Sequence, residues 1–105
     1  MSETSASIKA WGDETFGKAT DPVKLVERAE IEMAELKDAL AAGDMPEAGK
    51  EAADVVILLH RLIGDLGKDL GDEVDAKMAI NRTREWVSAG DGTGSHSKKS
   101  AWEEP

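Results

Sequence analysis

Two pairs of acidic residues have types and spacing that suit metal chemistry. Glu32 and Glu35 form the first pair, and Glu51 and Asp54 form the second. Residues three apart lie on one side of a helix, and helical phase places both pairs at the border of an apolar face. Converging carboxylates repel one another unless a cation lies between them, and hard divalent cations prefer oxygen ligands. The pattern therefore predicts a divalent metal site on two neighbouring helices.

Helical phase also separates this set from other acids of the same region. Glu27 and Glu30 have the same spacing, but Glu27 faces the back of the helix and Glu30 flanks the other edge of the apolar face. A single acidic pair is common on solvated helices, so a purely surface role is the alternative for either pair taken alone. Asp65 follows Arg61 by one turn, and either joins the site or pairs with that arginine.

A polar and basic row follows later in the chain. Lys77, Asn81 and Arg84 recur at helical spacing, and Leu70 and Val74 lie on the same face. Basic side chains on a core-facing side need an anionic partner, which is either an acid of the protein or a bound triphosphate. Lys and Arg contact phosphate oxygens, and Asn can bind a base or sugar edge. Because the sequence has no glycine-rich phosphate loop, phosphate chemistry would depend on metal.

The elements that position these residues are helices. Asp21 followed by proline predicts a helix start, and Gly43 predicts its end. Apolar spacing then predicts helices over about 22–42, 46–66 and 70–87. The fold class is therefore all-α, as a helical hairpin plus a third helix.

The remaining segments read differently. We expect residues 1–21 to be irregular, and we find no convincing strand. Residues 1–88 form the expected catalytic domain. Residues 89–105, rich in Gly, Ser and Lys, are expected to form a flexible tail. The alternative to a flexible tail is that His96 closes over a bound nucleotide as a mobile lid.

The helix over 46–66 is apolar on nearly all sides, which is typical of a helix surrounded by other helices. A single chain with three helices offers few such neighbours. We therefore expect oligomerisation into a four-helix-bundle-type core.

Composition limits the partners and the compartment. The 105 residues suit one domain, and 13 basic against 22 acidic residues give a formal charge of −9. Such a surface disfavours nucleic-acid polymers and anionic membranes. The chain has no cysteine for a disulfide or a thiolate zinc site, its N-terminus does not read as a signal peptide, and its longest apolar run is far too short to span a bilayer. We expect a cytoplasmic protein.

Three segments occur in a diagnostic order: EMAEL at 32–36, EAADV at 51–55 and KMAINRTREW at 77–86. Together they resemble the MazG-like all-α nucleoside triphosphate pyrophosphohydrolases. The flanks WGDETFGKAT at 11–20 and DGTGSH at 91–96 are most similar to the dATP/dGTP pyrophosphohydrolase branch, termed MazZ-like, which is often carried by phages.

The resemblance implies Mg²⁺-dependent hydrolysis of a (d)NTP, with a purine dNTP favoured, by attack of water on the α-phosphorus. The products are the monophosphate and pyrophosphate, and Mn²⁺ or Co²⁺ would substitute for Mg²⁺. It also implies a homodimer or homotetramer in a bacterial or phage-infected cell. By match, the metal ligands would be Glu32, Glu35, Glu51 and Asp54.

The resemblance also assigns roles to single residues. Glu35, or alternatively Glu32, would accept the proton of the attacking water. Lys77 and Arg84 would hold the pyrophosphate, and Asn81 the sugar or base.

Two aromatic residues near the N-terminus and two later residues have open roles. Trp11 and Phe16 either stack on a purine or cap the hydrophobic core. We expect His60 to be structural and Trp86 to pack in a core or interface.

Two other functions compete with this assignment. One is a non-catalytic acidic helical dimer that acts as an interaction module. The other is a MazG-like house-cleaning enzyme for pyrimidine or damaged nucleotides.

Overall fold

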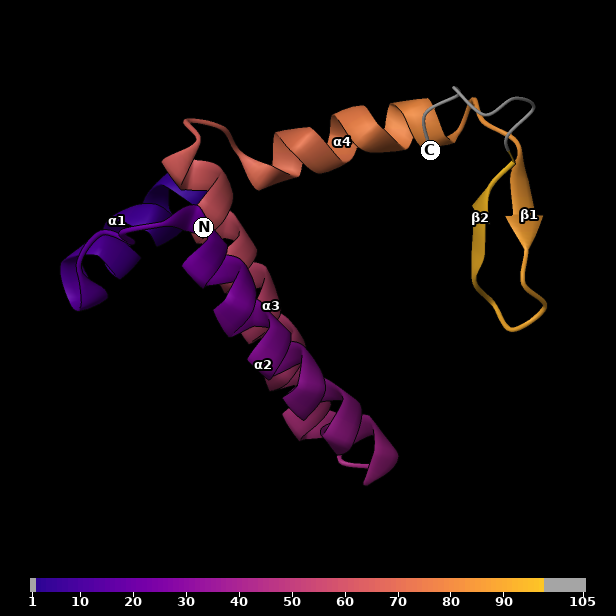
Figure 1. Cartoon of the computed structure of the whole chain (residues 1–105), viewed down its shortest axis with the longest axis horizontal. Coiled ribbons are helices and arrows are strands. Elements are labelled where there is room, and N and C mark those ends of the chain that lie inside the picture. Colours follow the sequence, from indigo (N-terminus) through magenta and orange to yellow (C-terminus); the bar gives the residue numbers. More distant parts are fainter. Residues whose placement is uncertain (1, 98–105) are drawn as a thin grey trace. The chain divides into compact units, whose positions relative to one another are not determined.

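The computed structural model describes residues 2–97 and confirms the all-α class (Figure 1). Four helices are followed by two short strands. Their bounds are α1 Ser5–Phe16, α2 Pro22–Ala41, α3 Met45–Asp65, α4 Leu70–Asn81, β1 Trp86–Ser88 and β2 Gly94–His96. The chain forms two compact units, unit 1 ending at Glu73 and unit 2 beginning at Val74.

The expected hairpin of unit 1 is formed by α2 and α3, which pack along each other (Figure 1). The Asp21 carboxylate accepts a hydrogen bond from the Val23 backbone at 2.9 Å, and Pro22 opens α2. Gly43 has a φ of +73°, which suits glycine at the turn after a helix. The Asp44 carboxylate then caps α3. These local signals explain why both helices begin and end where the sequence predicts.

Residues 1–21 contain a helix, so the expectation of an irregular segment was wrong. Thr4 and Ser7 form a reciprocal cap, in which the Ser7 backbone donates to Thr4 Oγ1 at 3.1 Å and the Thr4 backbone donates to Ser7 Oγ at 2.8 Å. Such a cap satisfies amide groups that would otherwise be unpaired at a helix start. Gly17, with a φ of +83°, follows the last residue of α1. The helix packs against α3.

Ser5 anchors the start of α1, and it is fully buried. Its backbone donates to Asp69 Oδ1 at 3.0 Å, and its hydroxyl lies 2.8 Å from His60 Nδ1. The same hydroxyl accepts a hydrogen bond from the Leu70 backbone at 2.7 Å. The backbone hydrogen bonds from Ser5 and Asp72 lower the pKa of Asp69. His60 therefore has a structural contact, as expected, and α1 is tied to the turn after α3.

Helix α4, the third of the helices predicted from the sequence, ends at Asn81 and not at residue 87 as predicted. After Asn81 the backbone makes tight three-residue turns, with Thr83 donating to Ile80 at 3.0 Å and Arg84 to Asn81 at 3.2 Å. The Thr83 hydroxyl also donates to the Ile80 carbonyl, at 2.7 Å. Such side-chain bonds to the backbone compete with helix continuation. The helical spacing over 82–87 was therefore misleading.

A short antiparallel hairpin follows, which corrects the expectation of no strand. Trp86 pairs with His96 and Ser88 with Gly94. Trp and Val favour strands, and Gly90 and Gly92 have φ of +91° and +94° in the connecting turn. The tail expected from residue 89 thus begins inside a hairpin. The rest of that predicted tail, residues 98–105, lies outside the described residues.

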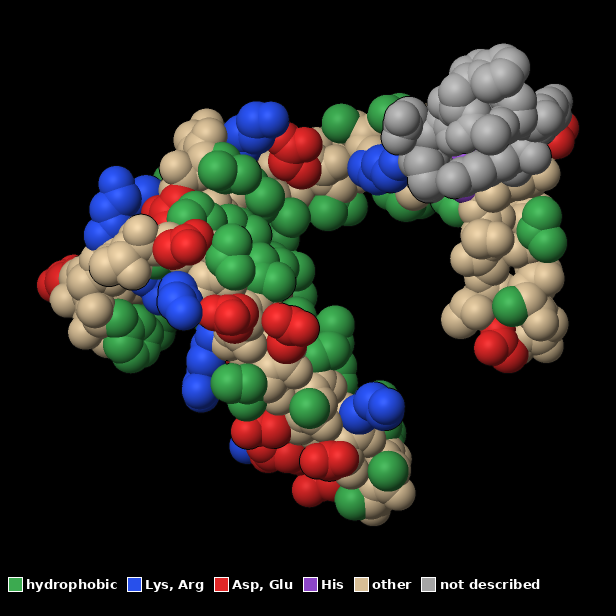
Figure 2. All heavy atoms as spheres, in the orientation of Figure 1, with side chains coloured by type: hydrophobic (Ala, Val, Ile, Leu, Met, Phe, Trp, Pro, Cys, Tyr) green, Lys and Arg blue, Asp and Glu red, His purple; other side chains and the backbone are tan. Residues whose placement is uncertain are grey.

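The apolar core of unit 1 is small. Its buried apolar residues are Ile8, Leu25, Ala29, Ala39, Ala48 and Val55. Larger apolar side chains of the hairpin remain exposed, among them Val26, Met33, Leu40 and Val56, and Figure 2 shows such side chains at the surface. The predicted oligomer would cover them, and it stays a prediction. No helix within residues 2–97 combines the length and apolar content needed to cross a membrane.

Candidate metal centre

Three of the four predicted carboxylates come together between α2 and α3. One carboxylate oxygen from each of Glu32, Glu35 and Glu51 lies within 4.8 Å of the others. Glu32 and Glu35 are one turn apart on α2, and Glu51 faces them from α3. The packing of the two helices therefore produces the convergence that helical phase predicts. Such a group of oxygens suits a hard divalent cation.

The electrostatics of this cluster are those of like charges held close together. Glu32 and Glu51 are each only 9% exposed. Hydrogen bonding with Glu32, burial and the nearby Glu35 raise the pKa of Glu51 to about 8, and hydrogen bonding with Glu51 lowers the pKa of Glu32. Glu51 Oε2 is buried and has no hydrogen-bond partner among the described residues. A cation would replace the proton that the cluster otherwise holds, so the residues fit a metal.

Asp54, the fourth predicted ligand, lies apart from the three-carboxylate cluster. It is on α3 one turn after Glu51 and is exposed. It lines a neighbouring cavity together with Glu32. Its role as a ligand therefore stays a prediction.

Arg28, which the sequence pattern did not single out, lies beside the cluster. Its guanidinium donates to Glu32 Oε1 at 3.3 Å. The i, i+4 spacing of the two residues was the available signal. Glu27, set aside on helical phase, pairs with Lys24 at 3.3 Å, and both side chains are more than half exposed. That surface pair agrees with its exclusion from the site.

A cavity of about 400 Å³ adjoins the carboxylates. Its lining residues come from α1, α2 and α3: Trp11, Phe16, Leu25, Arg28, Glu32, Asp54, Ile57, Leu58 and Arg61. The Trp11 and Phe16 rings meet edge to face, with centroids 5.6 Å apart. Because these side chains are 52% and 70% exposed, they do not cap the core. The structure thus places two predicted nucleotide-binding residues in the same cavity as Glu32 and Asp54.

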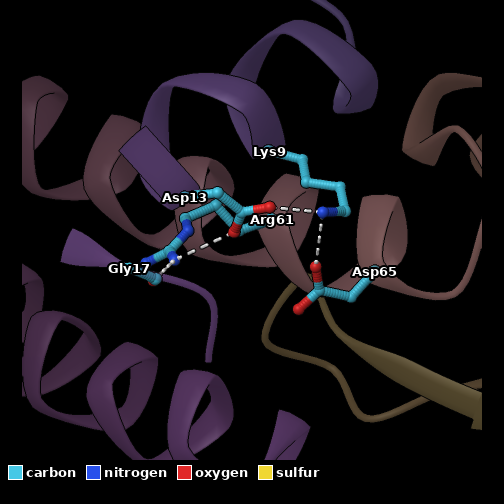
Figure 3. Close-up of polar contacts among 5 residues, drawn as sticks. All are labelled: Lys9, Asp13, Gly17, Arg61 and Asp65. Atoms are coloured by element: carbon cyan, nitrogen blue, oxygen red, sulfur yellow. Dashed lines mark hydrogen bonds and ion pairs between the residues drawn. The ribbon is translucent and has the colours of Figure 1, made fainter. Parts of the chain in front are cut away.

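Arg61 is the second residue that the sequence analysis did not assign to the site. It is 7% exposed and lies on α3 under the end of α1 (Figure 3). Its Nη2 atom donates to the Gly17 carbonyl at 3.3 Å and lies 3.7 Å from Asp13 Oδ1. The guanidinium carbon is 5.7 Å from the centre of the Phe16 ring. An arginine within an apolar helical pattern was the only signal in the sequence.

The ion pairs continue through Lys9. Its ammonium group contacts the Asp13 carboxylate and lies 3.4 Å from Asp65 Oδ1 (Figure 3). The hydrogen bond with Lys9 lowers the pKa of Asp13, and that with Asp13 raises the pKa of Lys9. Of the two roles considered for Asp65, the structure shows an ion pair, but the partner is Lys9 rather than Arg61.

The predicted phosphate-binding row belongs to the end of α4 and the turn after it. Lys77 is exposed, and the Asn81 carbonyl accepts a hydrogen bond from the Trp86 indole at 2.9 Å. Asn81 Oδ1, Arg84 Nη1 and His96 Nδ1 are buried and lack hydrogen-bond partners within the described part of the chain. Contact of Lys77, Asn81 and Arg84 with a phosphate or with the carboxylates stays a prediction.

Comparison with curated proteins finds two phage relatives. A dATP/dGTP diphosphohydrolase of Cyanophage S-2L is 42% identical over 57 residues, which are 54% of each chain. A dATP/dGTP diphosphohydrolase of Salmonella phage PMBT28 is 35% identical over 96 residues, which are 91% of this chain and 31% of the relative. The chain therefore spans about half the length of the first relative and less of the second. No family model matches the sequence.

Comparison with solved structures finds a similar fold over nearly the whole chain. The Cyanophage S-2L MazG-like pyrophosphohydrolase, bound to dGDP and three catalytic Mn²⁺ ions per active site, superposes with a TM-score of 0.70. Its sequence is 32% identical, and the match covers 91% of both chains.

Proposed function

This chain belongs to the family of MazG-like pyrophosphohydrolases, and we propose from that premise that it hydrolyses a purine dNTP to the monophosphate and pyrophosphate. The observation that carries the proposal is the meeting of Glu32, Glu35 and Glu51 within 4.8 Å beside an aromatic-walled cavity. The two phage relatives are named for dATP and dGTP, and the similar structure holds dGDP. These names support a purine deoxynucleotide as the substrate.

The carboxylates supply the metal ligands in this proposal. Glu32, Glu35 and Glu51 hold Mg²⁺, with Asp54 joining from the cavity wall, and Mn²⁺ or Co²⁺ substitutes. A divalent ion bound there neutralises charge on phosphate oxygens and lowers the pKa of an attacking water. Glu35 is the exposed member of the cluster, which suits it to accept the proton of that water; Glu32 is the alternative.

The remaining residues bind the nucleotide. Trp11 and Phe16 offer aromatic faces to the base, which stack with any base and most readily with a large one. Lys77 and Arg84 hold the pyrophosphate oxygens, and Asn81 contacts the sugar or base. Asn81 Oδ1 and Arg84 Nη1, which have no partner among residues 2–97, support this role, because buried polar groups without partners are uncommon.

A second copy of the chain completes the fold in this proposal. The α2–α3 hairpin leaves Val26, Met33, Leu40 and Val56 exposed. A second hairpin would bury these side chains in a four-helix core. Light scattering is expected to give at least twice the mass of one chain, as a dimer or tetramer. A monomer at micromolar concentration would contradict this part of the proposal.

The activity is tested by incubating the protein with each dNTP and Mg²⁺ while resolving pyrophosphate from orthophosphate. We expect pyrophosphate and monophosphate, with dATP and dGTP turned over fastest. Orthophosphate without pyrophosphate would exclude attack at the α-phosphorus. Preference for a pyrimidine or a damaged nucleotide would instead support the house-cleaning function, and no turnover of any nucleotide would support the interaction module.

A further inference from the structure

Arg61 has no part in the metal or phosphate chemistry proposed above, yet it is a charged residue buried in unit 1. It is 7% exposed, and most of its neighbours on α3 are apolar. Burying a charge is costly unless the charge is paired and hydrogen-bonded. Its retention between α1 and α3 therefore calls for a specific contact that an apolar residue would not provide.

The polar and aromatic contacts of the Arg61 guanidinium go to the last turn of α1 and to the residue after it. The guanidinium donates to the Gly17 carbonyl at 3.3 Å and lies beside Asp13 at 3.7 Å (Figure 3). It also lies over the Phe16 ring, at 5.7 Å from the ring centre. A guanidinium over an aromatic ring at this distance is attracted by the electron-rich face of the ring. One side chain thus fixes the backbone after Phe16, a carboxylate one turn earlier and the ring itself.

Gly12 shows how closely α1 rests on Arg61. A Cβ atom added at Gly12 would lie 2.1 Å from Arg61 Nε and 2.6 Å from Cδ. A larger residue here would have to displace the arginine from the place it occupies, and Gly12 directly follows Trp11. The backbone between the two aromatic residues of the cavity is therefore seated on the Arg61 side chain.

Trp11 and Phe16 depend on such support because the core does not hold them. Their side chains are 52% and 70% exposed, and they contact each other edge to face. Of the cavity-lining residues on α3, Arg61 is the one with a charged group that reaches α1. Packing alone would leave these two rings free to change rotamer.

We propose that Arg61 is a positioning residue that acts through Phe16. It holds the aromatic wall formed by Trp11 and Phe16 in place and thereby sets the affinity for the nucleobase. This inference rests on the proposed function, in which the base lies in the cavity beside the carboxylates. It predicts that Arg61 affects KM, whereas the carboxylates affect kcat.

The test measures kcat and KM for the preferred purine dNTP in Arg61→Met, together with Mn²⁺ binding to the carboxylates. We expect KM to rise on the order of ten-fold, the scale of losing one base–aromatic contact. We expect kcat to change by less than about twofold and Mn²⁺ affinity to stay unchanged. Arg61→Lys keeps the charge but not the planar group, and should recover only part of the KM. An unchanged KM, or a loss of Mn²⁺ affinity, would overturn the inference.

A double-mutant cycle with Phe16→Ala distinguishes positioning from general stability. If Arg61 acts through Phe16, then Arg61→Met adds little to the KM of Phe16→Ala. Additive effects on KM would contradict the inference. Lys9→Gln is the matched control, because Lys9 also joins α1 to α3 but does not line the cavity. It should lower the melting temperature and leave KM nearly unchanged; an equal rise of KM would indicate mere destabilisation of α1.

A further variant covers the case in which Arg61→Met does not fold. Asp13→Asn keeps the size of the side chain and removes the charge 3.7 Å from Arg61. It should raise KM a few-fold, and an unchanged KM would count against the inference. A wild-type protein without turnover would refute the proposed function itself. An active wild type whose KM does not change on substitution of Arg61 would refute the positioning role alone.

Discussion

The carboxylate cluster and the contact between α1 and α3 differ in how their charges are arranged. In the cluster, three acids of the same sign lie within 4.8 Å of one another. In the contact, Lys9 and Arg61 alternate with Asp13 and Asp65. The first arrangement gathers charges of one sign and suits a bound cation, while the second pairs opposite charges of the protein with one another. Neutralising a charge should therefore lower kcat in the first region. In the second region it should lower stability and, at Arg61 and Asp13, raise KM.

The largest effect is expected for Glu51→Gln in the cluster. The pKa of Glu51 is raised to about 8, so the metal-free protein carries a proton there at neutral pH, and glutamine resembles that state. We expect turnover to fall by about 100-fold or more, because a metal ligand is lost, while the metal-free melting temperature hardly changes. Turnover assays and thermal unfolding measure the two quantities.

Glu27→Gln is the control for that variant, because Glu27 is an acid of the same helical hairpin in a surface pair with Lys24. It should keep normal turnover. Near-normal activity of Glu51→Gln, or an equal loss in Glu27→Gln, would show that the ligand assignment is wrong.

The next effect is expected at the contact between α1 and α3. Gly12→Ala would place a Cβ atom 2.1 Å from Arg61 Nε, so the helix or the arginine must move. Overpacking of this kind costs about 1–3 kcal/mol of the free energy of unfolding, and KM should rise as it does in the Arg61 variants. Denaturant unfolding and steady-state kinetics provide the two measurements.

Gly49→Ala is matched to Gly12→Ala, since both glycines are inside helices but a Cβ at Gly49 meets nothing within 4 Å. Relief of the glycine penalty should stabilise α3 by about 0.5–1 kcal/mol. If the two substitutions changed stability alike, the close seating of α1 on Arg61 would not exist in solution.

A smaller effect is expected from pH on the metal-free protein. Glu51 has a folded-state pKa of about 8 against an ordinary 4.5. Between these values the folded chain keeps a proton that the unfolded chain releases. The contribution of Glu51 to the free energy of unfolding is therefore fully present below pH 4.5, falls as pH rises, and levels off above about 8. Melting temperatures measured across this window without metal should show the decline.

Mg²⁺ should reverse that decline, because the ion displaces the proton and its binding strengthens as pH rises toward 8. The Glu51→Gln variant should lack this part of the pH dependence. A wild-type curve that is flat in this window, or identical with Mg²⁺, would argue against the mutual repulsion of the three acids.

The smallest effect is expected for Asp65→Asn. It removes one ion pair, at 3.4 Å from Lys9, while the contact of Lys9 with Asp13 remains. The melting temperature should fall by a few degrees at most, with kcat and KM unchanged. A substantial loss of kcat would mean that Asp65 belongs to the site after all, and would erase the contrast between the two regions.

The sequence predicts the α2–α3 hairpin and its acids because the signals are local. Asp21, Pro22 and Gly43 mark helix ends, and helical phase alone brings Glu32 and Glu35 to the face that meets Glu51. The start of α1 also had a local signal in its reciprocal cap, but α1 carries only a sparse apolar stripe. What holds it is its fit to α3, which depends on residues far away in the chain.

The contacts of Arg61 and the β1–β2 hairpin were not predicted from the sequence, for related reasons. The partner of Arg61 at Gly17 is 44 residues away, so no window of sequence shows the pair. Strands as short as Trp86–Ser88 and Gly94–His96 are defined by their pairing with each other, since three residues are too few to show alternation.

The buried Ser5 has a consequence for the order in which the chain folds. Its hydrogen bonds reach Asp69 and Leu70, 64 and 65 residues further along, whereas α2 and α3 are joined by a short turn. Contacts between distant residues form late, because the intervening chain must first be ordered. We therefore expect α1 to dock after the α2–α3 hairpin has formed, although it precedes both helices in the chain, so that its apolar residues gain a lasting partner only when the turn after α3 is in place.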